Sequence, residues 1–161
     1  DIYPALEKGT IDAAEFVGPY DDEKLGFYKV AKHYYYPGWW EPGPTIHFFV
    51  NKKEWEKLPK EYQEAFQAAA YEANVTMLAE YDYKNPLALS RLLQQGIKLH
   101  SFSDEIMDAA YKASFELYAD ESGKNPAFKK IFTEWDKFRK SQNAWFGLAE
   151  ARMDRFSQSH K

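Results

Sequence analysis

The segment from Ala14 to Asn51 constrains the fold most, because glycine and proline interrupt it three times. The interruptions are Gly18-Pro19, Pro37-Gly38 and Pro42-Gly43-Pro44, and each one stops a regular element. Only short elements fit between them. We expect two short strands here, each bringing one carboxylate, Glu15 or Glu41, into a ligand pocket, with the helices after Asn51 as support.

The composition excludes several classes of function. Of the 161 residues, 18% are aromatic, which favours thick helix interfaces or rings stacked on a ligand. The net charge of -4 and the lack of a Lys/Arg run argue against a nucleic-acid partner. There is no cysteine, which excludes disulfides, thiolate metal sites and cysteine nucleophiles. No stretch approaches the ~20 apolar residues of a membrane span.

The N-terminal third is predicted to contain two helices and three strands. The helices are expected at Tyr3–Lys8, ended by Gly9, and from a cap at Asp21 or Asp22 to Ala31. The strands are expected at Ile11–Val17, Tyr34–Tyr36 and Thr45–Val50.

The remainder is predicted to be mostly helical. Asn51 and Glu54 form a capping pair, and Pro59 suits the first turn of a helix of about 25 residues with a break near Asn85-Pro86. Helix then continues over Leu87–Gln95 to Gly96, followed by a strand at Ile97–His100 and a helix from a cap at Ser103 to near Gly123.

The last helix is predicted to be unusually long. It starts at Asn125-Pro126, and about 33 residues would span about 50 Å. Its apolar stripe includes Ile131, Trp135, Phe138 and Trp145. Such a helix needs a second surface. Two alternatives are open. The second surface belongs to a partner subunit or a missing lobe, or a kink near Ser141 or Gly147 folds the helix back on its own domain.

Two carboxylates are the candidate functional groups. Glu15 is the only charge between Ala13 and Val17, and an unpaired carboxylate buried in an apolar strand needs a cation, a donor or water. An exposed strand end or a salt bridge would explain it equally. Glu41 follows Trp39-Trp40 in a rigid turn. The alternative to a functional role is that Glu41 is an ordinary solvent-exposed carboxylate of a loop. Together with backbone carbonyls, two carboxylates suit Na⁺ or Ca²⁺.

The other reactive side chains form no recognisable motif. No Gly-rich phosphate loop, G-x-S-x-G or H-E-x-x-H is present, and the serines support no triad. The four histidines are far apart in sequence and are interpreted as structural or surface residues: His33, His47, His100 and His160. The tyrosines of Tyr34–Tyr36 and the pair Trp39-Trp40 belong to the core or stack on a ligand.

The runs DIYPALEKGTIDAAEFVGPYDD (1–22) and YYYPGWWEPGPTIHFFVN (34–51), with the helix after VNKKEWEKLP, resemble the periplasmic solute-binding receptors of TRAP transporters, the tripartite ATP-independent carriers of organic acids. The likeness is greatest to the branch that binds 2-oxo and 2-hydroxy monocarboxylates with a metal ion, and it covers most of the chain. It implies an α/β chain, the C-terminal part of a two-lobe periplasmic-binding-protein-like fold, helix-rich with a few strands and a long C-terminal helix.

The resemblance also implies roles for residues. Residues 1–51 would supply inter-lobe strands and a pocket wall, 52–124 helical support with a short strand, and 125–161 a dimerisation helix. Glu15, the backbone carbonyl of Phe16, and Glu41 would bind Na⁺ or Ca²⁺, with no organic cofactor. Phe16, Tyr20, Trp40 and Glu41 would contact the acid. Many receptors of this branch have Trp at the position of Phe16, so the pocket wall is expected to be reshaped there.

The family receptors are much longer than this chain, and their carboxylate-binding arginine and a polar metal ligand lie in the half that would precede Asp1. We therefore expect a C-terminal fragment, without signal peptide, of a periplasmic receptor that holds half a site. The partners implied are a small carboxylate, the TRAP membrane permease subunits and a second copy bound through the C-terminal helix. The alternatives are a helical interaction protein without ligand and an enzyme using Glu15 and Glu41 as acid and base. The sequence supplies no nucleophile for an enzyme, so we expect none.

Overall fold

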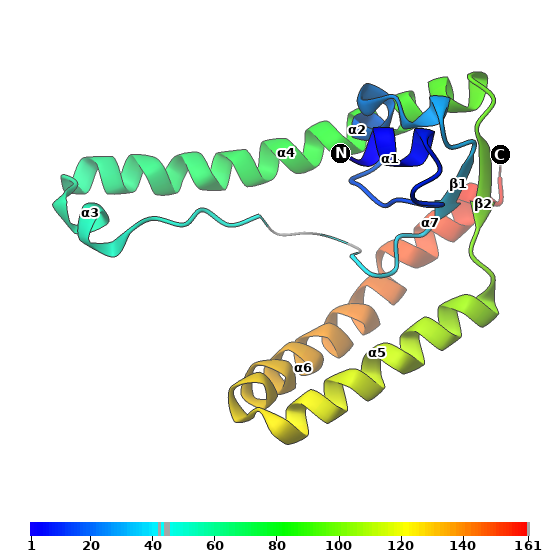
Figure 1. Ribbon diagram of the computed structural model, residues 1–161. Helices are drawn as coiled ribbons and strands as arrows, with labels where there is room; N and C mark the ends of the chain where they lie inside the picture. The colour runs from blue at the N-terminus through cyan, green and yellow to red at the C-terminus, as the bar shows by residue number, and fades with distance from the viewer. Residues whose placement is uncertain (42, 44–45, 161) are drawn as a thin grey trace. The chain divides into compact units, whose positions relative to one another are not determined.

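The computed structural model of the chain describes residues 1–41, 43 and 46–160. The elements in order are α1 (Ile2–Glu7), α2 (Pro19–Leu25), the 3-10 helix η1 (Phe27–Lys29), β1 (His33–Tyr36), α3 (Lys52–Lys57), α4 (Lys60–Gln94), β2 (Lys98–Ser101), α5 (Asp104–Lys124), α6 (Pro126–Leu148) and α7 (Glu150–Gln158) (Figure 1). They divide into two compact units, Asp1–Phe102 and the residues from Ser103 onward.

A two-stranded parallel sheet lies in the first unit. β1 and β2 pair with Tyr35 opposite His100, and the Phe102 N–H extends the ladder by donating to the Tyr36 carbonyl at 2.8 Å. Parallel strands require a long crossover, which α3 and α4 supply here. Both strands were predicted, at Tyr34–Tyr36 and Ile97–His100, and the helix-rich α/β class is confirmed.

The other two predicted strands do not form. Ile11–Val17 is irregular, and Ile46–Val50 makes no strand; Thr45, the first residue of that prediction, lies outside the described residues. Among the described residues, β1 and β2 pair only with each other. A β-prone segment forms a strand only when a neighbouring strand supplies hydrogen-bond partners for its backbone. Phe49 is accordingly 95% exposed.

One continuous helix of 35 residues, α4, replaces the predicted helix with a break. It passes through Pro86, although proline removes a backbone donor and disfavours the helix interior. Packing offsets this cost. Ala88 and Leu92, two and six residues beyond Pro86, are buried, and α2 packs on α4 (Figure 1).

Three predicted helix caps are confirmed by hydrogen bonds. The Asn51 side-chain oxygen accepts from the N–H groups of Lys53 and Glu54, at 2.9 and 3.3 Å. Ser103 Oγ accepts from the N–H of Ile106, and Asn125 Oδ1 accepts from the first turn of α6. These polar side chains satisfy donors that lack a partner within the helix.

The predicted cap at Asp21 or Asp22 is wrong. α2 begins at Pro19 with Gly18 as its cap, so both aspartates lie in the first turn. The helix also ends earlier than Ala31. Gly26 adopts a left-handed conformation, with φ of 75°, and separates α2 from η1.

Aromatic side chains between α5 and α6 hold the second unit together. The Tyr118 ring lies 5.1 Å from the Phe132 ring and 6.3 Å from the Trp135 ring. The Arg139 guanidinium lies 4.9 Å from the centre of the Phe115 ring, in cation–π contact. The two helices form a hairpin (Figure 1).

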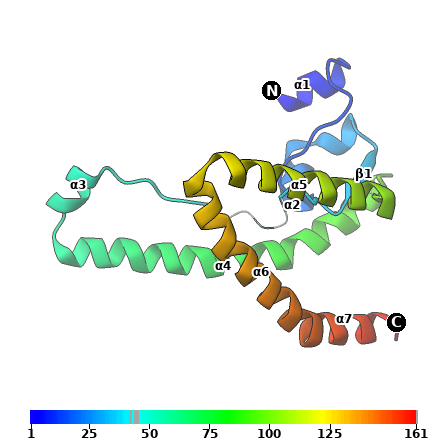
Figure 2. The same cartoon turned by 90° about the horizontal axis from the view of Figure 1, so that it is seen from below.

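The predicted long C-terminal helix is divided in two. α6 ends at Leu148, and Ala149, with φ of -75° and ψ of -73°, separates it from α7. The division falls two residues after Gly147, one of the two predicted kink positions, and Figure 2 shows a bend there. Neither helix has a buried residue. Ile131, Phe138 and Trp145, at intervals of seven residues, are 72%, 64% and 61% exposed.

Candidate functional site

Glu15 and Phe16 lie in the irregular segment between α1 and α2. Glu15 is exposed and forms no ion pair or hydrogen bond with the described residues. Phe16 packs edge-on against Phe27 of η1, with 6.1 Å between ring centres, and stays 44% exposed. Glu15 is therefore neither buried nor salt-bridged within the described part of the chain, and its carboxylate is open to a ligand or cation.

Tyr20 opens α2 and is held by α4. Gly18 has no side chain with which to cap the helix, and the Asn85 side-chain oxygen accepts from the Tyr20 N–H at 3.0 Å instead. Lys84 Nζ donates to the Tyr20 hydroxyl at 3.1 Å, and Lys24 Nζ lies 3.9 Å from the ring centre. These two ammonium groups, Lys24 first, lower the pKa of Tyr20.

Asp22 is the one buried charged residue in the described part of the chain, at 9% exposure. The Tyr34 hydroxyl of β1 donates to its Oδ2, whereas its buried Oδ1 has no hydrogen-bond partner among the described residues. Desolvation raises the pKa of Asp22, and the bond from Tyr34 partly opposes this. Burial and the neighbouring carboxylate raise the pKa of Tyr34 as well.

Trp40 and Glu41 lie in the turn that follows β1. The Tyr36-Pro37 peptide bond is cis, and the Trp39 N–H donates to the Pro37 carbonyl at 2.9 Å. The Trp40 ring meets Phe102, just beyond β2, edge-on with 6.1 Å between centres and is 45% exposed. Glu41 is exposed and forms no ion pair with the described residues. The structure therefore presents Glu41 on a turn that aromatic contacts anchor to the sheet.

Two histidines that the sequence separates by 67 positions meet on the sheet. His33 Nδ1 and His100 Nε2 are 2.9 Å apart, and the two rings stack with 5.1 Å between centres. The stack continues through Tyr35 to Phe102, which also contacts Trp40. Sequence spacing could not reveal this row, because it arises from the pairing register of β1 and β2.

The predicted site residues form two groups. Glu15, Phe16 and Tyr20 precede or begin α2, and Trp40 and Glu41 follow β1. Within the described residues, no side-chain hydrogen bond, ion pair or ring contact joins the two groups. No cluster of three or more His, Asp or Glu side chains in that part of the chain could hold a metal. Glu15 nevertheless interacts electrostatically with α2, because its negative charge adds to desolvation, the main cause, in raising the pKa of Asp22.

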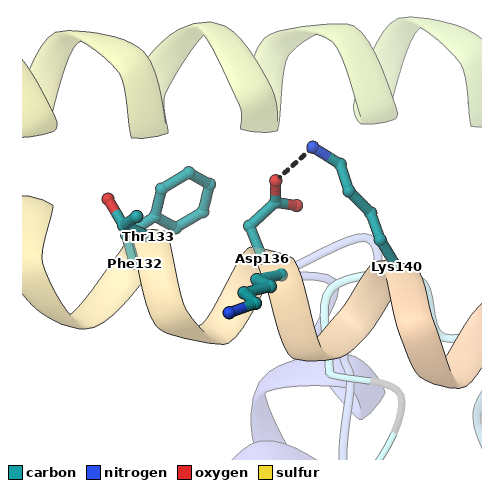
Figure 3. Close-up of a pocket in the computed structure, with 5 residues that line it drawn as sticks. Phe132, Thr133, Asp136 and Lys140 are labelled. Atoms are coloured by element: carbon teal, nitrogen blue, oxygen red, sulfur yellow. Dashed lines mark ion pairs between the residues drawn. The ribbon is translucent and has the colours of Figure 1, made fainter.

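Two hollows on the surface lie away from these residues. The first, of about 450 Å³, is lined entirely by α6 and contains the Asp136–Lys140 ion pair of 2.6 Å (Figure 3). The second, of about 550 Å³, lies where Phe48 and Trp55 pack edge-on against Phe66 of α4. Neither includes a predicted site residue. Among the helices of the described chain, none is long and apolar enough to cross a membrane.

Comparison with known proteins identifies the family of the chain. The model of a family described as bacterial extracellular solute-binding protein, family 7, matches residues 1–124. A monocarboxylate 2-oxoacid-binding periplasmic protein of a Nostoc species is 54% identical over 159 residues, which are 99% of this chain and 44% of that protein.

Two solved structures have the same fold over nearly the whole chain. A TRAP transporter solute-binding protein of Bordetella bronchiseptica, a mixed-occupancy dimer with calcium and picolinate in one site, matches with a TM-score of 0.96 and 54% identity over 99% of this chain and 48% of its own. A TRAP periplasmic solute-binding protein of Colwellia psychrerythraea, with bound calcium and pyruvate, matches with a TM-score of 0.89 and 33% identity over 96% of this chain and 48% of its own.

The fold and these matches define the class of protein to which the chain is similar, the bacterial solute-binding receptors. The chain belongs to family 7 of the bacterial extracellular solute-binding proteins, the receptors of TRAP transporters, as its motifs predicted. It spans about half the length of the relatives it matches.

Proposed function

We propose that this chain forms one wall of a periplasmic receptor that binds a small 2-oxo or 2-hydroxy monocarboxylate together with Ca²⁺ or Na⁺ and delivers the acid to TRAP permease subunits. The observation that carries the proposal is the 54% identity, over 99% of the chain, to a 2-oxoacid-binding periplasmic protein. The calcium and pyruvate in the Colwellia receptor support the same ligand chemistry.

The donor groups of this chain suit a hard cation. Glu15 and Glu41 offer carboxylate oxygens that form no ion pair with the described residues, and Phe16 adds a backbone carbonyl. Ca²⁺ takes six to eight oxygen ligands, so these groups supply part of its coordination shell and the acid itself supplies more. When bound, the cation would neutralise the ligand carboxylate. We assign no catalytic step to the carboxylates.

The aromatic residues would shape the pocket around the acid. Trp40 is half-exposed and is anchored by Phe102, so it presents a fixed apolar surface. Tyr20 is likewise fixed by Asn85 and Lys84. Within this proposal, residues 1–51 form the pocket wall, 52–124 its helical support and 125–161 a dimerisation element.

Calorimetry on a receptor of the relatives' full length that contains these residues tests the proposal. Pyruvate is expected to bind in the presence of Ca²⁺ and to bind at least tenfold more weakly without it. The substitution Glu41→Gln keeps the side chain's shape and removes a charged cation ligand, so it is expected to weaken pyruvate binding at least tenfold. Glu72→Gln, an exposed glutamate of α4, is the matched control. Wild-type affinity in Glu41→Gln would refute the metal assignment.

The exposed apolar row of α6 favours a second role, homodimerisation. Ile131, Phe138 and Trp145 lie on one side of the helix because seven residues make nearly two turns. Exposed apolar surface of this kind marks an interaction site. The Bordetella relative is a dimer, which supports a second copy of this chain as the occupant.

A further inference from the structure

One side-chain hydrogen bond joins α2 to β1, the two elements beside which the two groups of predicted site residues lie. Tyr20 lies in the first turn of α2, and Trp40 and Glu41 follow β1. Among the described residues, the bond from the Tyr34 hydroxyl to Asp22 is the hydrogen bond that directly connects these two elements. We propose that Asp22 and Tyr34 are positioning residues of the receptor, which fix α2 to β1 and so set the spacing between Tyr20 and the turn that carries Trp40 and Glu41. This inference rests on the proposed function.

Both sides of this connection are otherwise well anchored. Four side-chain hydrogen bonds or ion pairs tie α2 to α4. Asn85 accepts from the Tyr20 N–H, Lys84 donates to the Tyr20 hydroxyl at 3.1 Å, the Tyr81 hydroxyl donates to Asp21 at 2.7 Å, and Arg91 pairs with Glu23 at 2.6 Å. β1 is held by its ladder to β2, and the turn is held by the Trp40–Phe102 contact. The Asp22–Tyr34 bond thus couples two rigid parts, and a change in this bond shifts one part against the other.

The burial of Asp22 also indicates a specific geometric role. A buried carboxylate that uses only one of its oxygens costs folding free energy, and an apolar residue would avoid that cost. A hydrogen bond to a carboxylate, however, depends on direction, whereas apolar packing does not. A hydrogen bond from a phenol on a neighbouring strand fixes both the distance and the orientation of the two elements.

Four variants of the full-length receptor separate positioning from simple stabilisation. Tyr34→Phe removes only the hydroxyl, and Tyr36→Phe removes the equivalent atom from an exposed tyrosine of the same strand whose hydroxyl bonds to no described residue. Asp22→Asn keeps an oxygen that can accept the Tyr34 bond, whereas Asp22→Ala removes the acceptor. The measurements are amide hydrogen exchange of residues 19–25 without ligand, and pyruvate affinity with saturating Ca²⁺.

We expect Tyr34→Phe and Asp22→Ala to speed exchange in α2 at least tenfold and to weaken pyruvate binding at least fivefold. Asp22→Asn and Tyr36→Phe are expected to stay within twofold of wild type in both measurements. Unchanged exchange in Tyr34→Phe would overturn the proposal, and so would faster exchange with unchanged affinity. Should Tyr34→Phe not fold, Asp22→Glu, which displaces the carboxylate by one methylene, carries the same expectations.

Failure of the proposed function is a distinguishable result. A wild-type receptor that binds no carboxylate with or without Ca²⁺ refutes that function directly. The exchange rates of α2 in the ligand-free variants still decide whether the Asp22–Tyr34 bond holds α2 to β1.

Discussion

The side chain of Asn85, in the C-terminal third of α4, accepts a hydrogen bond from the backbone N–H of Tyr20 at 3.0 Å and so caps a helix 65 residues earlier in the chain. α2 begins at Pro19, and the residue at its cap position, Gly18, has no side chain with which to cap the helix. A residue from another helix satisfies one of the donors that helix geometry leaves free. Asn85 therefore links the start of α2 to the point where α4 passes through Pro86.

Replacing Asn85 with alanine is expected to destabilise the protein by about 1 kcal/mol, the usual cost of losing a capping side chain. Asn74→Ala is the matched control, because Asn74 is an exposed asparagine of the same helix and both substitutions gain the same helix propensity. Urea unfolding of the two variants measures the difference. Equal stabilities would show that the cross-helix cap contributes nothing.

The pair formed by Arg91 and Glu23 predicts a second effect on stability. Arg91 Nε and Nη2 donate to the two carboxylate oxygens of Glu23 at 2.8 and 2.6 Å, across α4 and α2. Lysine cannot reproduce this two-point geometry, so Arg91→Lys is expected to lower the free energy of unfolding relative to wild type, as urea unfolding measures. Arg155→Lys, at an exposed arginine without an ion pair in the described chain, is the control.

The same pair has a defined dependence on pH. The hydrogen bond from Arg91 lowers the pKa of Glu23. A carboxylate whose folded pKa is lowered contributes stability above its unfolded pKa and loses it as the pH falls through the folded value. The stability difference between wild type and Arg91→Lys is therefore expected to shrink on acidification, as measured by urea unfolding at pH 7 and near pH 3. A difference that grows on acidification would contradict the assignment.

Asp22 is expected to show the opposite dependence, since desolvation, reinforced by the charges of Asp21 and Glu15, raises its pKa. The folded state then binds the Asp22 proton more tightly than the unfolded state. This contribution is fully present below the unfolded pKa and is lost as the pH rises through the raised folded pKa. Asp22→Asn cannot titrate, so its stability relative to wild type is expected to improve from pH 3 to pH 7. Urea unfolding across this range measures the trend, and a constant difference would contradict it.

Much of the helical framework was predictable because its signals are local. Asn51, Ser103 and Asn125 cap their helices as predicted, since a cap depends on residues only two or three positions apart. The strands at Tyr34–Tyr36 and Ile97–His100 were also predicted, but their register brings His33 against His100, and no short-range pattern contains that information.

The errors share a physical cause, which is contact between residues distant in sequence. Ile11–Val17 has the composition of a strand but no partner among the described residues. The predicted break at Pro86 fails because burial of Ala88 and Leu92 outweighs a single missing hydrogen bond. The burial of Asp22 depends on a strand twelve residues away, so a helix-start pattern could not reveal it. The metal and ligand roles of Glu15, Phe16, Tyr20, Trp40 and Glu41 stay predictions.

The exposed row of α6 gives the last prediction, on assembly. If Phe138 and Trp145 are buried between two copies, each contributes about 1.5 to 3 kcal/mol to the dimer, and an acidic residue at either position opposes association. Light scattering is expected to give a mass of about twice 18.9 kDa for the wild-type chain and the single-chain mass for Phe138→Glu and Trp145→Glu. Thr133→Glu adds the same charge at another position around the helix and is expected to stay dimeric. A monomeric wild type would exclude this surface as a homodimer interface in the chain alone.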